Sequence, residues 1–164
     1  PSWLYPVKMG ATTIWERWDG QKTDSTFQDA GMNSFNHYAY GAIGDWMYRS
    51  SAGIDNGKPG YKEIVVYPYI TKKLDFSRAS FESPYGTISS GWERKDGKII
   101  LRVVIPPNTS ARIFLPTGDL SKVNLREEAT KKPQTAIPVF THNKKENRIE
   151  ASAGSGEYVF EISE

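Results

Sequence analysis

The feature that most constrains this chain is a change of residue pattern at Gly57-Lys58-Pro59-Gly60. Beyond it, apolar and polar residues alternate with a period of two, as they do in half-buried strands. Before it, the chain has a helical repeat and many aromatic rings: the first 57 residues hold four of the five Trp and ten of the 21 aromatic residues. The pattern predicts two unlike pieces, residues 1–57 and residues 58–164.

The second piece consists mostly of strand-like runs. Five are clear, at residues 61–69, 79–82, 87–94, 98–105 and 111–115, and three weaker ones follow near Val123, Ile137 and Tyr158. The turn signals between them include Asp96-Gly97, Pro106-Pro107-Asn108 and Gly118-Asp119. Seven or eight short strands over residues 58–164 predict a mainly β fold, an antiparallel β-sandwich.

The first piece contains one strong helical pattern, at residues 34–52. Apolar residues recur there at the i, i+3, i+4, i+7 spacing, between an N-cap at Asn33 or Ser34 and Gly53 at the C-terminal end. The opposite face has few charges, and a helix without a charged face normally lies inside a larger body. Because the chain also opens on Pro1 without an initiator Met, we expect it to be cut from a longer protein.

Composition and charge exclude several functions. The 21 Lys and Arg residues nearly balance the 19 Asp and Glu residues and are scattered, so we expect no nucleic-acid partner. No apolar run approaches the roughly 20 residues that span a bilayer, so we expect no membrane segment. The chain has no Cys, and His37 and His142 fall in different pieces, so neither a metal site, a Ser-His-Asp triad nor a cofactor is predicted.

Glu16 is the candidate catalytic residue, because it stands between Trp15 and Trp18 in the segment GATTIWERWDG. Sugar rings stack on indole faces, and cleavage of a glycosidic bond needs carboxyl groups. The simpler interpretation of Thr13 to Glu16 is a capping box that closes a helix start. His37 has two interpretations as well: it binds a substrate hydroxyl, or it only packs the helix.

Two long motifs resemble the end of the catalytic domain of bacterial α-L-rhamnosidases. They are GATTIWERWDG at residues 10–20 and GMNSFNHYAYGAIGDWMYRSSAGI at residues 31–54. Downstream, YKEIVVYPY at residues 61–69 and SPYGTISSGWERKDGKIILRVVIPPNTSARIFLP at residues 83–116 look like the C-terminal β-sandwich of the same family. The resemblance covers nearly the whole chain.

The resemblance implies an inverting glycosidase with an (α/α)6 barrel, of which residues 1–57 are the end: a loop and one long helix. It implies that Glu16 is the general base and that the general acid lies upstream of this chain. His37 matches a substrate-contacting His, and Trp18 would help to wall the site. The implied partners are rhamnose-containing glycosides or polysaccharides, in the periplasm or cytoplasm of a bacterium. Residues 21–29 depart from the family pattern.

Three hypotheses follow for the function. In the first, the chain is part of an α-L-rhamnosidase and is inactive alone, and its orphaned helix drives self-association. In the second, the β piece is a non-catalytic carbohydrate-binding or structural module that uses Trp92, Tyr85 and Phe81, unless these rings pack in the core. In the third, the parent is another sugar enzyme with the same barrel, a phosphorylase or an unsaturated-uronide hydrolase.

Overall fold

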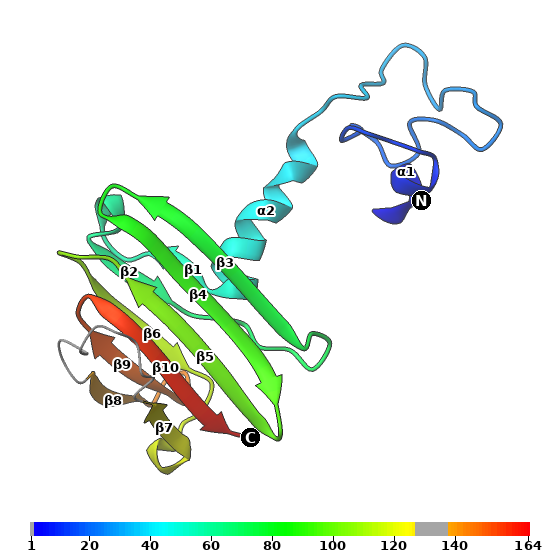
Figure 1. Cartoon of the computed structure of the whole chain (residues 1–164). Helices are drawn as coiled ribbons and strands as arrows, with labels where there is room; N and C mark the ends of the chain where they lie inside the picture. The colour runs from blue at the N-terminus through cyan, green and yellow to red at the C-terminus, as the bar shows by residue number, and fades with distance from the viewer. Residues whose placement is uncertain (1, 127–137) are drawn as a thin grey trace. The chain divides into compact units, whose positions relative to one another are not determined.

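The computed structural model describes residues 2–126 and 138–164. The chain divides into two compact units, Pro1–Trp46 and Met47–Glu164. The first unit has little regular structure: a short helix α1 (Leu4–Lys8), a single bridge between Gln21 and Phe27, and the first turns of a longer helix. The second unit contains the strands (Figure 1).

The strands form two sheets of five within the described residues. One sheet has the order β1-β2-β6-β9-β8, and the other has the order β3-β4-β5-β10-β7. The bounds are β1 (Ile54–Asn56), β2 (Glu63–Val66), β3 (Phe76–Ser83), β4 (Gly86–Lys95), β5 (Lys98–Ile105), β6 (Ser110–Leu115), β7 (Val123–Arg126), β8 (Val139–Asn143), β9 (Arg148–Ala153) and β10 (Gly156–Ser163). Two short helical turns, η3 (Pro59–Tyr61) and η4 (Leu120–Lys122), precede β2 and β7.

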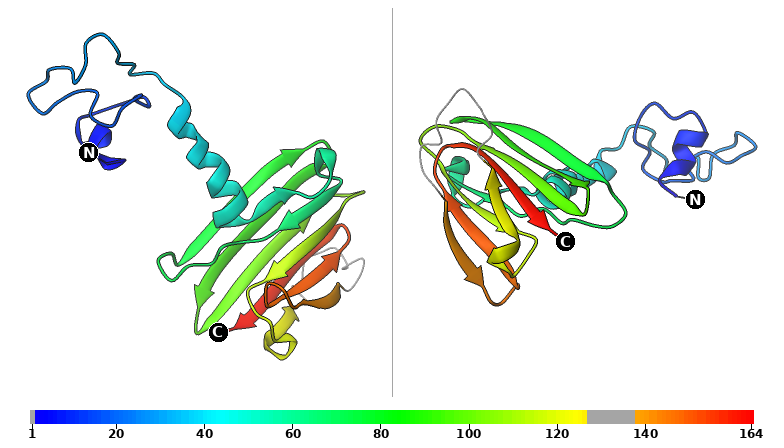
Figure 2. Two further views of the ribbon diagram at one scale, coloured as in Figure 1. Left: turned by 180° about the vertical axis from the view of Figure 1, so that it is seen from behind. Right: turned by 60° about the horizontal axis from the view of Figure 1, so that its bottom comes forward.

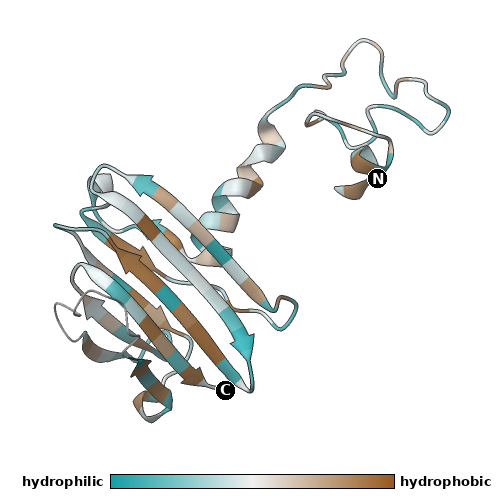
Figure 3. Ribbon diagram, viewed as in Figure 1, coloured by the Kyte–Doolittle hydropathy of each residue, from teal (hydrophilic) through white to brown (hydrophobic). Residues whose placement is uncertain are grey.

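The core lies between the two sheets, which Figure 2 shows as separate layers. Alternate residues of each strand point inward, and one continuous cluster joins Ile64 and Ile113 of the first sheet to Trp92, Leu101 and Phe160 of the second. Strands β5 and β10 carry the broadest hydrophobic segments (Figure 3). Fully burying one such side chain stabilises a fold by about 1.5–3 kcal/mol, so this cluster dominates the stability of the second unit.

The prediction of a mainly β sandwich is confirmed, with differences in detail. Asp96 and Gly97 form the tight turn between β4 and β5, both with positive φ, at 51° and 72°. One pairing, β2 with β6, is parallel. Strands β1 and β9 were not predicted, because β1 is very short and β9 buries the small residues Ala151 and Ala153, which weaken its alternation. Of the predicted run near Ile137, that residue itself lies outside the described residues, and β8 begins at Val139.

The predicted start of the long helix is wrong. Helical structure runs from Ala39 to Ala52 through η1 (Ala39–Ala42), α2 (Ile43–Trp46) and η2 (Met47–Ala52), so residues 34–38 are not helical. The backbone there pairs with another segment, as described below. The end is as predicted: Gly53 has a φ of 87°, and a Cβ at this position would lie 2.3 Å from the Pro68 nitrogen. Only glycine fits both requirements.

The last helical turn, η2, is anchored in the sandwich. The indole Nε1 of Trp92 donates to the Ser51 carbonyl at 2.8 Å, and the Ser90 hydroxyl donates to the Ala52 carbonyl at 2.7 Å. These bonds satisfy carbonyls that a helix end leaves without intrahelical partners. Trp92 is therefore a buried core residue, 2% exposed, and it offers no platform for a sugar.

The two other rings of the predicted sugar-binding face also have packing roles. Phe81 packs against the core and lies 4.7 Å from the Tyr61 ring, measured between centroids. Tyr85 is 37% exposed, with the Lys62 ammonium over its ring.

Across the described residues, no helix has the length and apolar character needed to cross a membrane.

Candidate active-site segment

Two segments of the first unit lie side by side and carry the candidate residues. The Glu16 N–H donates to the Ser34 carbonyl at 2.8 Å, and the His37 N–H donates to the Ile14 carbonyl at 2.8 Å. Residues 13–16 and 34–37 therefore run antiparallel. The pairing explains why no helix forms before Ala39, and it brings Glu16 and His37 onto neighbouring lengths of backbone.

The Glu16 carboxylate is braced through one oxygen. Its Oε2 accepts the N–H of Ser34 at 3.1 Å, and the side chain is half-buried. Within residues 2–126 and 138–164, its Oε1 accepts no hydrogen bond. The neighbouring Arg17 points elsewhere, because its Nη1 donates to Gln28 Oε1 at 2.5 Å. A carboxylate with one fixed and one open oxygen is able to take a proton from a positioned water.

The capping-box interpretation of Thr13 and Glu16 is wrong. The described chain forms no helix at these residues, and the two side chains instead bridge segments that are far apart in sequence. The Thr13 hydroxyl donates to the Phe35 carbonyl, and Glu16 binds a backbone N–H 18 residues further along the chain. Both side chains hold the paired segments together.

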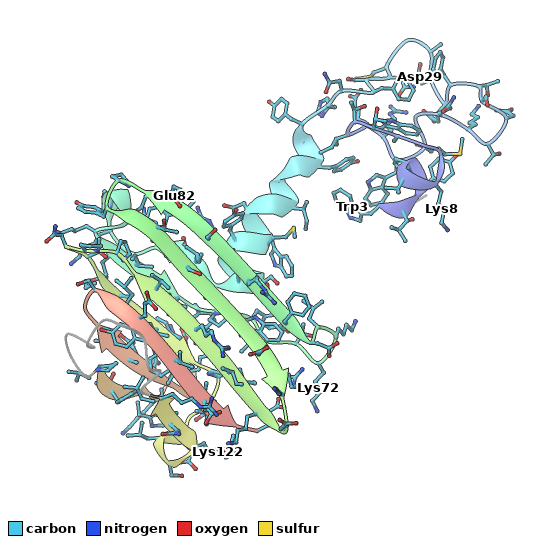
Figure 4. All side chains as sticks on the ribbon, viewed as in Figure 1. Trp3, Lys8, Asp29, Lys72, Glu82 and Lys122 are labelled. Carbon is cyan, nitrogen blue, oxygen red and sulfur yellow. The ribbon has the colours of Figure 1, made fainter. Side chains whose placement is uncertain are left out.

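The two Trp residues around Glu16 enter separate aromatic clusters. Trp15 is 5% exposed and packs edge-on against Phe35, with ring centroids 5.0 Å apart, and Phe27 extends this cluster at 5.7 Å from Phe35. Trp18 packs at 5.6 Å from Trp3, which Figure 4 shows close to α1. The sequence placed both Trp residues beside the carboxylate, but the fold turns them to different neighbours.

Trp18 has one polar atom without a hydrogen-bond partner. Its ring lies 5.7 Å from Tyr40, and Tyr40 in turn lies 5.1 Å from Trp3, so three rings support one another. The indole Nε1 of Trp18 is buried and has no hydrogen-bond partner within the described residues. A buried indole N–H normally finds an acceptor.

His37 has a defined hydrogen-bonding state. Its Nδ1 accepts the N–H of Ala39 at 3.3 Å, and its ring stacks on Tyr38 with centroids 5.7 Å apart. When Nδ1 of a neutral imidazole is an acceptor, Nε2 carries the proton and donates. The half-buried His37 therefore presents an N–H donor, which suits a sugar hydroxyl.

Sequence reasoning missed Asn33, which was considered only as a helix cap. Its Nδ2 donates to the Gly20 carbonyl at 2.7 Å, while its Oδ1 is buried without a partner in the described part of the chain. Asn33 thus ties the end of the Glu16 segment to the start of the His37 segment. Its place next to Ser34 within the second motif was the only available signal.

The loop between the two segments is closed by its own polar residues. The Lys22 N–H donates to the Thr26 carbonyl at 2.8 Å, and both the hydroxyl and the N–H of Thr26 donate to Asp24. These bonds from Thr26 lower the pKa of Asp24 below its ordinary value. Asp24 is therefore a turn-forming residue.

His142, the other histidine of the chain, lies on β8 in the second unit. Within residues 2–126 and 138–164, no three His, Asp or Glu side chains are grouped so as to hold a metal ion.

Comparison with known families decides what these segments belong to. Residues 1–51 match the bacterial alpha-L-rhamnosidase 6 hairpin glycosidase domain, and residues 53–130 match the bacterial alpha-L-rhamnosidase C-terminal domain. This chain belongs to the bacterial α-L-rhamnosidase family. The two domain matches meet at Gly53, the residue that ends the helix.

Proteins with similar sequences are named alpha-L-rhamnosidases. An alpha-L-rhamnosidase of Streptomyces avermitilis is 44% identical over 123 residues, covering 75% of this chain and 12% of the relative. One from Formosa agariphila is 39% identical over 158 residues, covering 96% of this chain and 17% of the relative. The chain thus spans only a small part of the length of these α-L-rhamnosidases.

Solved structures of the family match as well. The Streptomyces avermitilis alpha-L-rhamnosidase complexed with L-rhamnose has a TM-score of 0.84 at 36% identity, covering 99% of this chain and 15% of that chain. The Aspergillus terreus enzyme has a TM-score of 0.74 at 29% identity, covering 99% and 16%. The paired segments and the sandwich both fall within these matched regions.

Proposed function

We propose that the protein containing this chain removes terminal α-L-rhamnosyl residues by an inverting mechanism, with Glu16 as the general base. The observation that carries the proposal is the Glu16 carboxylate, with Oε2 held by the Ser34 N–H and Oε1 open. Residues 1–57 would belong to the catalytic barrel and residues 58–164 to the sandwich domain. Support comes from family membership and from the pairing of the two motifs.

In this mechanism Glu16 takes a proton from a water that attacks the anomeric carbon. The attack comes from the ring face opposite the leaving group, so the product has the inverted configuration. Inverting enzymes hold their two carboxyl groups about 6.5–9.5 Å apart to leave room for that water. The partner that protonates the leaving oxygen would come from the rest of the parent protein.

His37 and Trp18 would hold the sugar. The Nε2–H of His37 is a donor fixed by the bond from Ala39 to Nδ1, and it would bind a rhamnose hydroxyl. Trp18, supported by Trp3 and Tyr40, would close one side of the site with its ring. Positioning of this kind lowers the barrier because the reacting groups no longer have to find one another.

The test is Glu16→Gln in the full-length protein that contains this chain. Glutamine keeps the shape but cannot accept the proton, so we expect kcat on an aryl rhamnoside to fall at least about 100-fold. Glu82→Gln, an equal change on exposed β3, serves as the control and should leave the rate unaltered. Proton NMR of the first product formed should show inverted stereochemistry.

The isolated 164-residue chain provides the second measurement. Without the general acid, we expect no detectable hydrolysis of the aryl rhamnoside. Substantial turnover by the isolated chain, or by full-length Glu16→Gln, would contradict the assignment of the base.

A further inference from the structure

The outer face of the β3-β4-β5 sheet has a trough along β4. Ile88, Ser90 and Trp92 point into the core, so Ser89 and Gly91 point outward. These outward residues are small, and Figure 3 shows β4 as a mostly pale strand beside the strongly coloured β5. The outer surface of the sheet is therefore low at these two positions of β4.

Two arginines flank the trough in one row. Arg78 of β3 and Arg102 of β5 both pair in register with Gly91. Since neighbouring strands lie about 4.8 Å apart, the two arginine backbones are roughly 9 to 10 Å apart with no side chain between them. A Cβ at Gly91 would come within 3.0 Å of the Arg78 Cβ, so glycine is what allows this close approach.

The result is an open cavity of about 310 Å³, with Gly91 and Ser89 at its floor. Phe76, which is 55% exposed, and Glu93 line one end of it. Single-ligand sites in proteins begin at about 300 Å³, so the cavity has room for one small polar group or sugar unit.

The guanidinium groups of Arg78 and Arg102 each contact a neighbouring side chain. The Arg78 Cζ lies 5.1 Å from the centroid of the Phe76 ring, and Arg78 pairs with no carboxylate within the described residues. The Nη1 of Arg102 contacts Glu93 Oε1 at 2.8 Å. With two cations and one anion, the lining keeps a net positive charge, and the charge of Arg78 is unneutralised.

We propose that this trough binds the carboxylate or sulfate group of an anionic saccharide. Guanidinium groups bind carboxylate and sulfate-like oxyanions with paired hydrogen bonds, and Arg78 and Arg102 flank Gly91 on its two sides as the arms of such a clamp. Ser89 adds a hydroxyl at the floor for the sugar. A stacked nucleobase is disfavoured, because the Arg78 guanidinium lies over the exposed Phe76 ring.

The choice of a saccharide as the carrier of the oxyanion rests on the proposed function, whereas the oxyanion clamp itself does not. The site lies on the sandwich and involves neither Glu16 nor His37. Binding can therefore be measured on this chain without turnover, and its failure would leave the hydrolase proposal standing.

The experiment is a titration of the 15N-labelled chain, followed by amide chemical shifts. The probes are tetragalacturonate, its fully methyl-esterified form and a sulfated carrageenan tetrasaccharide. We expect shifts centred on β3, β4 and β5 with tetragalacturonate or the sulfated probe, and none with the neutral ester. The stronger of the two anionic probes identifies the group that the clamp prefers. Added salt should weaken binding.

Variants decide whether the clamp is responsible. Arg78→Gln should weaken binding at least about 10-fold, while Arg78→Lys, which keeps the charge but loses the paired donors, should give an intermediate loss. Lys122→Gln removes the same charge from exposed η4, beyond the trough (Figure 4), and should bind like the wild type.

The proposal is overturned if neither anionic probe shifts the β3-β4-β5 amides at millimolar concentration. It is also overturned if Arg78→Gln and Lys122→Gln weaken binding equally, because that result would indicate attraction by the overall charge. If Arg78→Gln does not give a folded spectrum, Arg78→Lys decides: unchanged affinity in that variant would exclude a paired-donor clamp.

Discussion

The two units of this chain stabilise themselves in different ways. Among the described apolar residues of the first unit, only Trp15 is buried, whereas Met32, Tyr38, Ile43 and Trp46 are all at least about half exposed. In the second unit, both sheets bury one face in a common cluster. The first unit is held together by backbone hydrogen bonds and contacts between aromatic rings, and the second by a hydrophobic core between its two sheets. The candidate catalytic residues therefore lie in the part of the chain that has little buried core of its own.

Separating the two units should show the largest difference in stability between them. We expect residues 47–164 to fold alone and unfold cooperatively, because their core is complete, and residues 1–46 alone to show no cooperative transition. Circular dichroism during thermal unfolding measures both. A cooperative transition in residues 1–46 would contradict this expectation and show that the first unit is stable by itself.

Shortening a single core side chain should have the next largest effect on stability. Leu101→Ala removes a fully buried side chain from the centre of β5, and we expect the free energy of unfolding to fall by about 2–5 kcal/mol. Leu120→Ala, at a residue that is 48% exposed in η4, is the matched control and should change it by less than about 0.5 kcal/mol. Urea unfolding of both variants gives the difference.

The join between helix and sandwich can be tested through one hydrogen bond. Trp92→Phe keeps most of the ring but removes the donor to the Ser51 carbonyl, which is then buried without that partner. We expect a loss of about 1–3 kcal/mol in the free energy of unfolding. Trp46→Phe, at a residue that is 48% exposed, should have little effect in this chain. Equal losses in the two variants would mean that the bond to Ser51 contributes nothing.

The smallest expected effect on stability is at acid pH and comes from the carboxylate of Glu161 on β10. Burial alone would raise the pKa of Glu161, but Arg126 at 2.5 Å and Lys98 at 3.8 Å outweigh burial and lower it. Since the folded pKa lies below the ordinary value of 4.5, the stabilisation is complete above that pH and is lost as the pH falls through the folded pKa.

Glu161→Gln should therefore flatten the acid dependence of stability. Between pH 7 and about pH 3.5 we expect the melting temperature of the variant to fall less than that of the wild type. Glu157→Gln, an exposed change on the same strand, should leave the wild-type dependence in place. The two profiles are measured by differential scanning calorimetry.

Local patterns predicted a large part of the fold. The alternation over residues 98–105 matches β5, Asp96-Gly97 forms the hairpin turn, and Gly53 ends the helix. Each of these signals depends on the backbone preferences or burial of nearby residues, so a sequence contains it directly. The roles of Glu16, His37 and Trp18, the division at residue 57 and the self-association of the helix stay predictions.

Long-range contacts decided the rest. The helical spacing from Phe35 onward predicts an earlier start, but hydrogen bonds to residues 13–16 keep that backbone out of the helix until Ala39. Glu16 fits a capping box by spacing, yet it binds Ser34 across the pair. A hydrogen bond to a segment 18 residues away has no local signature. By itself the sequence determined most of the strands, the hairpin turn and the end of the helix, because their signals are local. Only the tertiary structure decided where the helix begins and which segments meet, because those depend on long-range hydrogen bonds.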